Sequence, residues 1–206
     1  MKTKLFTLAL ICVSTALFAQ GKINMVNDST RFIYFANYSG STHPLDAAFQ
    51  GQKVPAVLPS GRILMVDLYG GANSSSMTLQ RSTTINTAIP GGFGPSTFTS
   101  TNLPGGVDAF FQIQVRDSAF PTAQSAQAAD SYYGFSQILT MRPSTSIAFN
   151  AINNLGGTAL STWQPGTFDL DGGEFGAIAI EAIPEPSSLA ILGVGVVCFQ
   201  FFRRRK

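Results

Sequence analysis

The sequence predicts an all-β protein, in which a single β-sandwich domain is followed by one apolar C-terminal helix. Three observations support this prediction. Short runs of alternating apolar and polar residues recur between turn residues over the central part of the chain. No long stretch there has the 3.6-residue period of an amphipathic helix. Both ends of the 206-residue chain are apolar segments that carry basic residues.

The first segment has the order of a secretory signal peptide. Two lysines precede the apolar run 5–18, and small residues offer cleavage sites after Ala16 and after Ala19. We expect cleavage after Ala19, with cleavage after Ala16 as the alternative. Residues 1–19 are therefore predicted to direct export of the chain.

The body that remains, residues 20–183, has the size of one domain with its own core. It holds seven lysine and arginine residues against ten aspartate and glutamate residues, a net charge of about −3, which argues against a nucleic-acid-binding surface. Cys12 and Cys198 both lie in the terminal segments, so the body has no internal disulfide and depends on packing. The single histidine, His43, excludes a site built from several histidines.

The first half of the body contains predicted strands at residues 22–27, 31–35 and 63–69, and a predicted hairpin partner at 76–81. In the third strand Leu64, Val66 and Leu68 point to one face, and the residues between them point to the other. The glycines that follow this strand supply a turn back to its partner. Residues 39–60, which include His43, are expected to form a loop.

The clearest strand is residues 109–116, where large apolar residues alternate with Gln112, Gln114 and Arg116. This is the pattern of a half-buried antiparallel strand. The apolar positions Phe111, Ile113 and Val115 are predicted to be buried, and Gln112 and Gln114 to be more exposed.

The segments around this strand are predicted from their turn residues. Residues 90–106 contain three clusters of glycine and proline and are expected to form a loop. Within the alanine-rich stretch 119–133, one short helix is expected at about 122–131.

Further strands are expected at 146–151, with Ile147, Phe149 and Ala151 on one face, and at 166–170 and 176–183. Short antiparallel strands of this kind build β-sandwiches, and both a jelly-roll and an immunoglobulin-like arrangement fit them.

The C-terminal segment, residues 184–206, has three parts in a fixed order. The tripeptide Pro184-Glu185-Pro186 is followed by the apolar run 187–202 and by a basic cluster made of Arg203, Arg204, Arg205 and Lys206. As a helix the run would be about 24 Å long, somewhat short of a bilayer core of about 30 Å. Snorkelling arginines and local thinning of the bilayer accommodate the difference.

The alternative for this run is a buried helix of a soluble domain, which would normally show a polar stripe. The run shows none between Leu189 and Phe199, and the cluster of four cations at its end is typical of the cytoplasmic side of a membrane. We therefore predict a transmembrane helix at 187–202 that leaves the body outside the cytoplasmic membrane.

This order of tripeptide, apolar run and basic cluster resembles the PEP-CTERM sorting signal of exported Gram-negative bacterial proteins. The resemblance implies recognition by an exosortase at the inner membrane, followed by release or re-anchoring at the cell surface or in the extracellular matrix. It gives Pro184, Glu185 and Pro186 a recognition role and no catalytic one. The body also resembles verrucomicrobial-type PEP-CTERM proteins, in the opening strand 21–27, in Leu68-Tyr69-Gly70 and in Gln114-Val115-Arg116.

Other kinds of site have weaker support in the sequence. Three carboxylates, Asp169, Asp171 and Glu174, lie close together around a Gly-Gly pair, and such oxygen clusters attract Ca²⁺. A turn between two strands explains the same glycines, so no metal is expected. Residues 134–138 contain a serine but lack the last glycine of a nucleophile elbow, and His43 is the only available histidine base.

Aromatic residues are the candidates for sugar binding, because exported β-sandwiches often bind glycans through aromatic platforms. The candidates are Tyr132, Tyr133, Phe135 and Trp163. The competing interpretation is that they belong to the core, which the presence of 17 phenylalanines in the chain favours.

The sequence thus predicts a non-enzymatic cell-surface or matrix protein without a cofactor. Its partners would be the secretion machinery, an exosortase and the inner membrane. A glycan-binding module that contacts exopolysaccharide is the first alternative, and a secreted hydrolase is the second.

Overall fold

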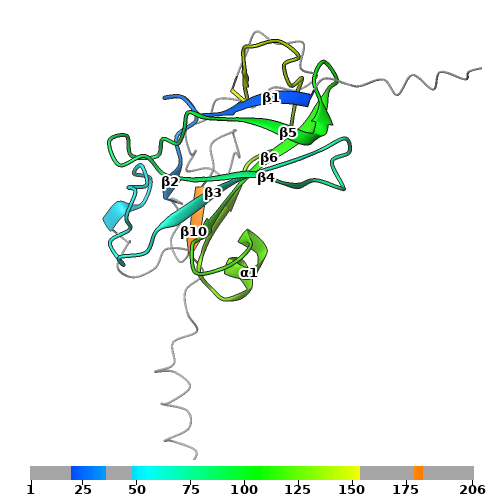
Figure 1. Ribbon diagram of the computed structural model, residues 1–206. Coiled ribbons are helices and arrows are strands. Elements are labelled where there is room, and N and C mark those ends of the chain that lie inside the picture. The colour runs from blue at the N-terminus through cyan, green and yellow to red at the C-terminus, as the bar shows by residue number, and fades with distance from the viewer. Residues whose placement is uncertain (1–19, 36–47, 154–178, 183–206) are drawn as a thin grey trace, which may run out of the picture.

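The computed structural model describes residues 20–35, 48–153 and 179–182. Within them the chain forms two β-sheets and one short helix (Figure 1). The all-β prediction is therefore confirmed at this level, and the choice between a jelly-roll and an immunoglobulin-like arrangement stays a prediction. The predicted signal peptide, the strand at 166–170 and the helix at 187–202 lie outside the described residues. No helix among the residues described has the length and apolar character needed to cross a membrane.

The larger sheet has seven strands and forms most of the body. In spatial order it contains β2 (Tyr34–Phe35), β10 (Ala179–Ala182), β7 (Tyr132–Phe135), β6 (Ala109–Asp117), β3 (Leu64–Gly71) and β4 (Thr78–Thr84), with β8 (Leu139–Met141) also paired to β6. Its central pair is β3 and β6, which are antiparallel from Leu64 opposite Asp117 to Gly71 opposite Phe110. All pairs in this sheet are antiparallel except β10 with β2.

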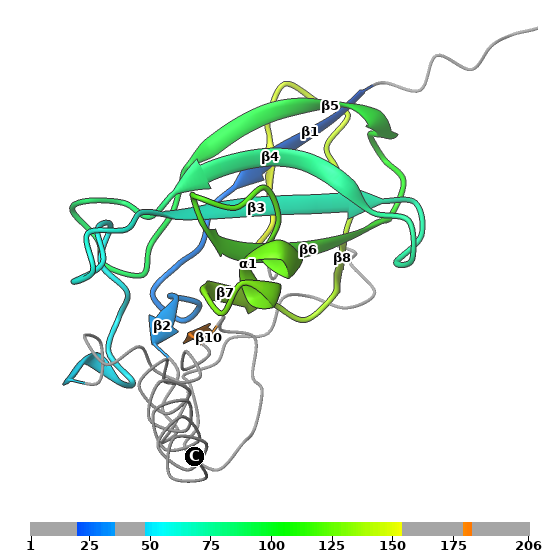
Figure 2. The ribbon, with the colours of Figure 1, turned by 90° about the horizontal axis from the view of Figure 1, so that it is seen from below.

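The smaller sheet consists of β5 (Ser96–Pro104), β1 (Gln20–Met25) and β9 (Asn150–Ala151). Figure 2 shows β1 and β5 beside β4 and β3, with β7, β2 and β10 beyond β6. Side chains join the neighbouring edges of the two sheets, since Ser100 donates to Gln80 at 2.9 Å and Asn102 donates to Thr78 at 3.1 Å. The two sheets thus approach each other along β4 and β5.

One apolar core lies between the sheets, and residues of both build it. Ile23 and Met25 come from β1, and Leu103 comes from β5. The larger sheet contributes the alternating positions of β3 and β6, which are Leu64, Val66, Leu68, Phe111, Ile113 and Val115. The period of two in these strands therefore identified their core face, and the predicted burial of Phe111, Ile113 and Val115 is confirmed.

The opposite face of β6 is less exposed than predicted. Gln112 is partly buried, but Gln114 is buried, with Phe135 of β7 and Asp67 of β3 as its cross-strand neighbours. Part of this face of β6 and β7 is covered by α1 (Ala123–Ala128), which lies over the lower part of the sheet (Figure 1). The expectation of an exposed Gln114 was wrong because the alternation of a strand cannot show what packs on its polar face.

The short helix is confirmed within its predicted range, and its start has a clear local cause. Thr122 is the N-cap residue, and its hydroxyl accepts a hydrogen bond from the N–H of Ser125. The Ser125 hydroxyl in turn accepts from the N–H of Thr122, which completes a capping box. Ala123 and Ala126 are the buried residues of this helix.

Residues 90–106 were predicted to be a loop, and this prediction is wrong because β5 occupies residues 96–104. The glycine and proline clusters lie before the strand and at its end, where Pro104 is the last residue of β5. The segment between them is rich in threonine and serine, and threonine is favoured in strands. It also pairs with β1 from Met25 opposite Ser96 to Gln20 opposite Pro104.

Residues 146–151 were predicted to be a strand, but only Asn150–Ala151 form one, and Ile147 is 91% exposed. The hydroxyls of this segment compete with sheet pairing. The Ser144 hydroxyl accepts from the N–H of Ser146, and the Ser146 hydroxyl accepts from the N–H of Ala148. Local bonds of this kind hold the chain in turns.

Candidate functional site

The last described strand, β10, is an internal strand of the larger sheet. It pairs with β2 in parallel, with Ala179 beside Tyr34, and with β7 in antiparallel fashion, with Ala182 opposite Tyr132. Figure 2 shows β10 close to β2 and β7. Since strands bond to it on both sides, the chain is held in the sheet up to Ala182.

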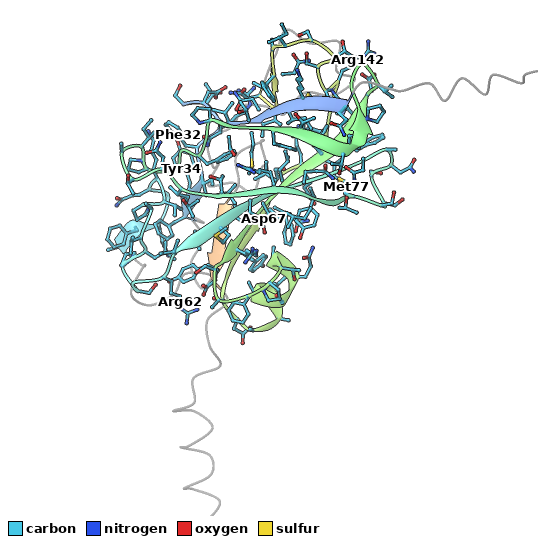
Figure 3. All side chains as sticks on the ribbon, in the orientation of Figure 1. Phe32, Tyr34, Arg62, Asp67, Met77 and Arg142 are labelled. Atoms are coloured by element: carbon cyan, nitrogen blue, oxygen red, sulfur yellow. The ribbon has the colours of Figure 1, made fainter. Side chains whose placement is uncertain are left out.

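A polar cluster lies where the chain leaves the sheet. Asp117, at the end of β6, accepts hydrogen bonds from Arg62 at 2.5 Å and from the hydroxyl of Ser131 at 2.7 Å. Arg62 also donates to Ser131 at 2.7 Å. Because Ser131 directly precedes Tyr132, the strand partner of Ala182, this cluster is level with the end of β10. Figure 3 labels Arg62 at this end of the molecule.

The cluster combines one buried and one solvated partner. The side chain of Asp117 is 2% exposed, whereas that of Arg62 is 45% exposed. Burial alone would raise the pKa of the Asp117 carboxyl. Hydrogen bonds from the N–H of Ala119, from Ser131 and from Arg62, together with the charge of Arg62, outweigh burial and hold that pKa below its usual value. Asp117 is therefore a stable anion that joins β6 to the turns before β3 and β7.

The other neighbour of β10, strand β2, is positioned by a second polar cluster. The Asn27 side chain donates to the carbonyls of Arg31 and Gly91 at 2.9 Å each and accepts from the N–H of Phe93 at 2.8 Å. Arg31 is buried and donates to Asp28 at 2.6 Å. This arrangement holds residues 27–33 against residues 91–93 and so places the start of β2.

A third ion pair lies on the sheet face that α1 partly covers. Asp67 of β3 is buried and accepts from Arg116 of β6 and from Ser82 of β4, at 2.6 Å each. Arg116 also donates to the carbonyl of Phe120, in the segment before α1. Asp67 is labelled in Figure 3. Its hydrogen bonds join three strands, which gives this pair a structural role.

Of the aromatic candidates in the described part of the chain, the two tyrosines are buried and Phe135 is partly buried. Tyr132 belongs to the main core, and Tyr133 packs with Ala123 and Ala126 of α1, beside the ring of Phe135. Neither tyrosine offers an open ring face to a sugar. Trp163 lies outside the described residues, so it stays a prediction.

The hydroxyl of Ser136, the serine of residues 134–138, is engaged in hydrogen bonds within the fold. Ser136 is buried, and its hydroxyl accepts from the N–H of Ile113 at 2.9 Å and donates to the carbonyl of Gln137 at 2.7 Å. Its hydroxyl therefore joins β6 to the residues after β7 and is not presented to solvent as a nucleophile.

The remaining predicted site residues lie outside the described residues: the weak metal candidates Asp169, Asp171 and Glu174, the tripeptide Pro184, Glu185 and Pro186, the basic cluster Arg203, Arg204, Arg205 and Lys206, and His43. Among the residues that are described, no group of three or more histidine, cysteine, aspartate or glutamate side chains could hold a metal ion.

The segment that follows β10 is the part of the chain that comparison with known families identifies. Residues 182–206 match the PEP-CTERM protein-sorting motif. The match begins at Ala182, the last residue of β10, and includes the tripeptide, the apolar run and the basic cluster. No curated protein and no solved structure matches the chain significantly.

The PEP-CTERM motif implies export, recognition by an exosortase and association with the cell envelope or surface. The sorting motif therefore begins at Ala182, the residue at which the last described strand of the sheet ends. The sequence pointed to the motif itself. It gave no signal for the Arg62, Asp117 and Ser131 cluster, whose members are up to 69 residues apart.

Proposed function

We propose that this chain is an exported, non-enzymatic component of the cell surface or extracellular matrix, delivered by an exosortase that reads its C-terminal motif. The observation that carries the proposal is the motif match at residues 182–206, which begins at the last residue of an internal strand of the sheet. In this proposal the body is the part of the protein that is transported, and the motif is the signal that the exosortase recognises.

Each part of the motif has a physical task in this process. Residues 187–202 partition into the bilayer because they are almost entirely apolar, and the four cations after them remain on the cytoplasmic side. Pro184 and Pro186 keep the tripeptide extended, since proline fixes its own backbone angle and restricts the residue before it. Glu185 is the one charged side chain of the tripeptide and the natural contact for a cationic group of the enzyme.

Processing at the tripeptide would leave the fold of the body intact. The described strands all end at or before Ala182, and the tripeptide begins at Pro184. A cut at or after the tripeptide therefore removes no strand of either sheet. The mature product would be the β-sheet body, free or attached to a new anchor at its C-terminal end.

The proposal is tested by fractionating a host that carries the matching exosortase. Glu185→Ala and Pro186→Ala should leave unprocessed precursor in the inner membrane, because the motif is no longer recognised. Deletion of residues 187–206 should release the body into the periplasm without sorting. Asp108→Ala is a matched control, since it removes an acidic side chain from the surface pair with Arg142, which lies outside the motif. Wild-type processing and localisation in all three motif variants would refute the proposal.

A further inference from the structure

Two exposed aliphatic side chains lie in the turn that leads into β3. We name residues 57–63 the exit turn. Val57 is 54% exposed and Ile63 is 44% exposed, and the two residues face each other as an isolated β-bridge. Between them the N–H of Leu58 donates to the carbonyl of Arg62 at 2.9 Å, which closes the turn. The two aliphatic side chains therefore lie across from each other at the base of the exit turn, and both are exposed to solvent.

The exit turn is tied to the end of the sheet from which the sorting motif emerges. Arg62 donates to Ser131 and Asp117, and the hydroxyl of Tyr132 donates to that of Ser60 at 3.4 Å. The backbone N–H of Ser118 donates to the carbonyl of Ile63 at 3.0 Å. Because Tyr132 is the strand partner of Ala182, the exit turn and the first residue of the motif belong to the same end of the body.

The connection between this end and the apolar run is short. Only residues 183–186 separate Ala182 from Ser187, and two of them are prolines. Even fully extended, the five steps from Ala182 to Ser187 cover at most about 18 Å. A folded domain of this size is about 35 Å across. When the apolar run is in the membrane, the end of the body that carries the exit turn must therefore face the bilayer.

We propose that the exit turn docks on the bilayer, with Val57 and Ile63 inserted among the lipid headgroups, while the sorting motif is still attached. The inference rests on the proposed function, because it needs the run 187–202 in the membrane. The tether keeps the turn at a high local concentration near the surface, so a weak contact is enough. The apolar face of an amphipathic helix at a membrane surface enters the boundary of headgroups and acyl chains to a depth of about 5–10 Å, and we expect the side chains of Val57 and Ile63 to enter the same region.

Lipid fits these two side chains better than a protein partner does. Two half-exposed side chains offer far less than the roughly 800 Å² that each side of a stable protein interface buries. The attraction does not come from net charge, because Arg62 is paired with Asp117. The long stem of Arg62 can nevertheless lie along the headgroup region with its charge in water.

The experiment uses the full-length chain with Cys12→Ser and Cys198→Ser, reconstituted in vesicles of phosphatidylethanolamine and phosphatidylglycerol. A single cysteine at Ile63→Cys or Val57→Cys carries an environment-sensitive fluorophore, and lipids with a quencher in the upper acyl chain report contact. The control is Val107→Cys, because Val107 is 45% exposed but lies next to Asp108, at the other end of β6. Figure 3 labels Arg142, the ion-pair partner of Asp108, far from Arg62.

We expect several-fold stronger quenching at positions 57 and 63 than at position 107. Equal quenching at the three positions would overturn the inference, and so would contact that occurs in native membranes but not in protein-free vesicles, since that result requires a protein partner. A fluorophore on the native Cys198, in a chain with Cys12→Ser only, reports the apolar run separately. Quenching at Cys198 without quenching at 57 and 63 refutes the docking alone, whereas no quenching at Cys198 refutes the membrane span as well.

Discussion

The carboxylate of Asp117 is an example of a single residue on which one end of the body depends. It is buried, but three hydrogen-bond donors and the charge of Arg62 hold its pKa below the usual value. Asp117→Asn keeps the shape of the side chain and removes its charge. We expect the variant to lose about 1–3 kcal/mol of unfolding free energy at pH 7, the usual cost of disturbing buried polar partners.

The pH dependence of this contribution follows from the direction of the shift. A carboxyl whose pKa is lower in the folded state stabilises the fold above its unfolded pKa, and this stabilisation is lost as the pH falls through the folded pKa. The difference in Tm between wild type and Asp117→Asn should therefore be constant near neutral pH and shrink below about pH 4. Asp108→Asn, at an exposed ion pair, is the control and should change Tm little. A difference that grows in acid would contradict this account.

Substitution of Phe111 tests how much a single core side chain contributes to the stability of the fold. Its side chain is 0% exposed and belongs to the main apolar cluster. Phe111→Ala should reduce the unfolding free energy by about 3–5 kcal/mol, out of a typical total of about 5–15 kcal/mol. Denaturant unfolding of both proteins measures the loss. An unchanged midpoint would show that this ring does not support the core.

Residues such as Phe111 could be predicted from sequence, whereas Gln114 and Asp67 could not. Alternation identifies the apolar face of a strand, because each apolar residue reports its own preference for burial. The burial of Asp67 depends on Arg116, 49 residues away, and on Ser82. Such pairs form only when the strands lie side by side in the folded sheet, so no local sequence pattern predicts them.

At the scale of elements, a strand was predicted correctly when its alternation of apolar and polar residues extended over many residues. Residues 109–116 and 63–69 have long, regular alternation, and both are strands of nearly the predicted length. The strand β5 lies between glycine and proline clusters, which made the whole segment resemble a loop. The short strands β7 and β8 have only four and three residues, too few for a period to show.

The placement of β10 between β2 and β7 leads to a prediction for this element. Proline cannot donate to a strand ladder and is disfavoured in an internal strand. We therefore expect Ile180→Pro to destabilise the body strongly, because Ile180 is paired with Phe35 and lies within the segment that also pairs with β7. Proline at Ile147, a nearly fully exposed residue outside any strand, is the control. Similar Tm values for the two variants would show that β10 is not an internal strand in solution.

At the scale of the whole molecule, the body and the sorting motif differ in how well they can be identified from the sequence. The motif is contiguous and depends on residue order, so the sequence alone pointed to it and the family comparison located it at residues 182–206. The body depends on contacts between distant strands, and its sequence indicated the fold class but not the strand order. The boundary between the two parts lies at Ala182, where the last strand ends and the motif begins.

This boundary predicts opposite outcomes for two truncations that differ by only five residues. A chain of residues 20–183 keeps β10, so it should fold with the Tm and the β-rich circular dichroism of the longer chain 20–206 measured in detergent. A chain of residues 20–178 loses β10 and exposes the inner edges of β2 and β7. Since the net stability of a domain is only about 5–15 kcal/mol, we expect the shorter chain to be largely unfolded or to melt at a much lower temperature. Equal stability of the two truncations would mean that β10 contributes nothing to the stability of the body.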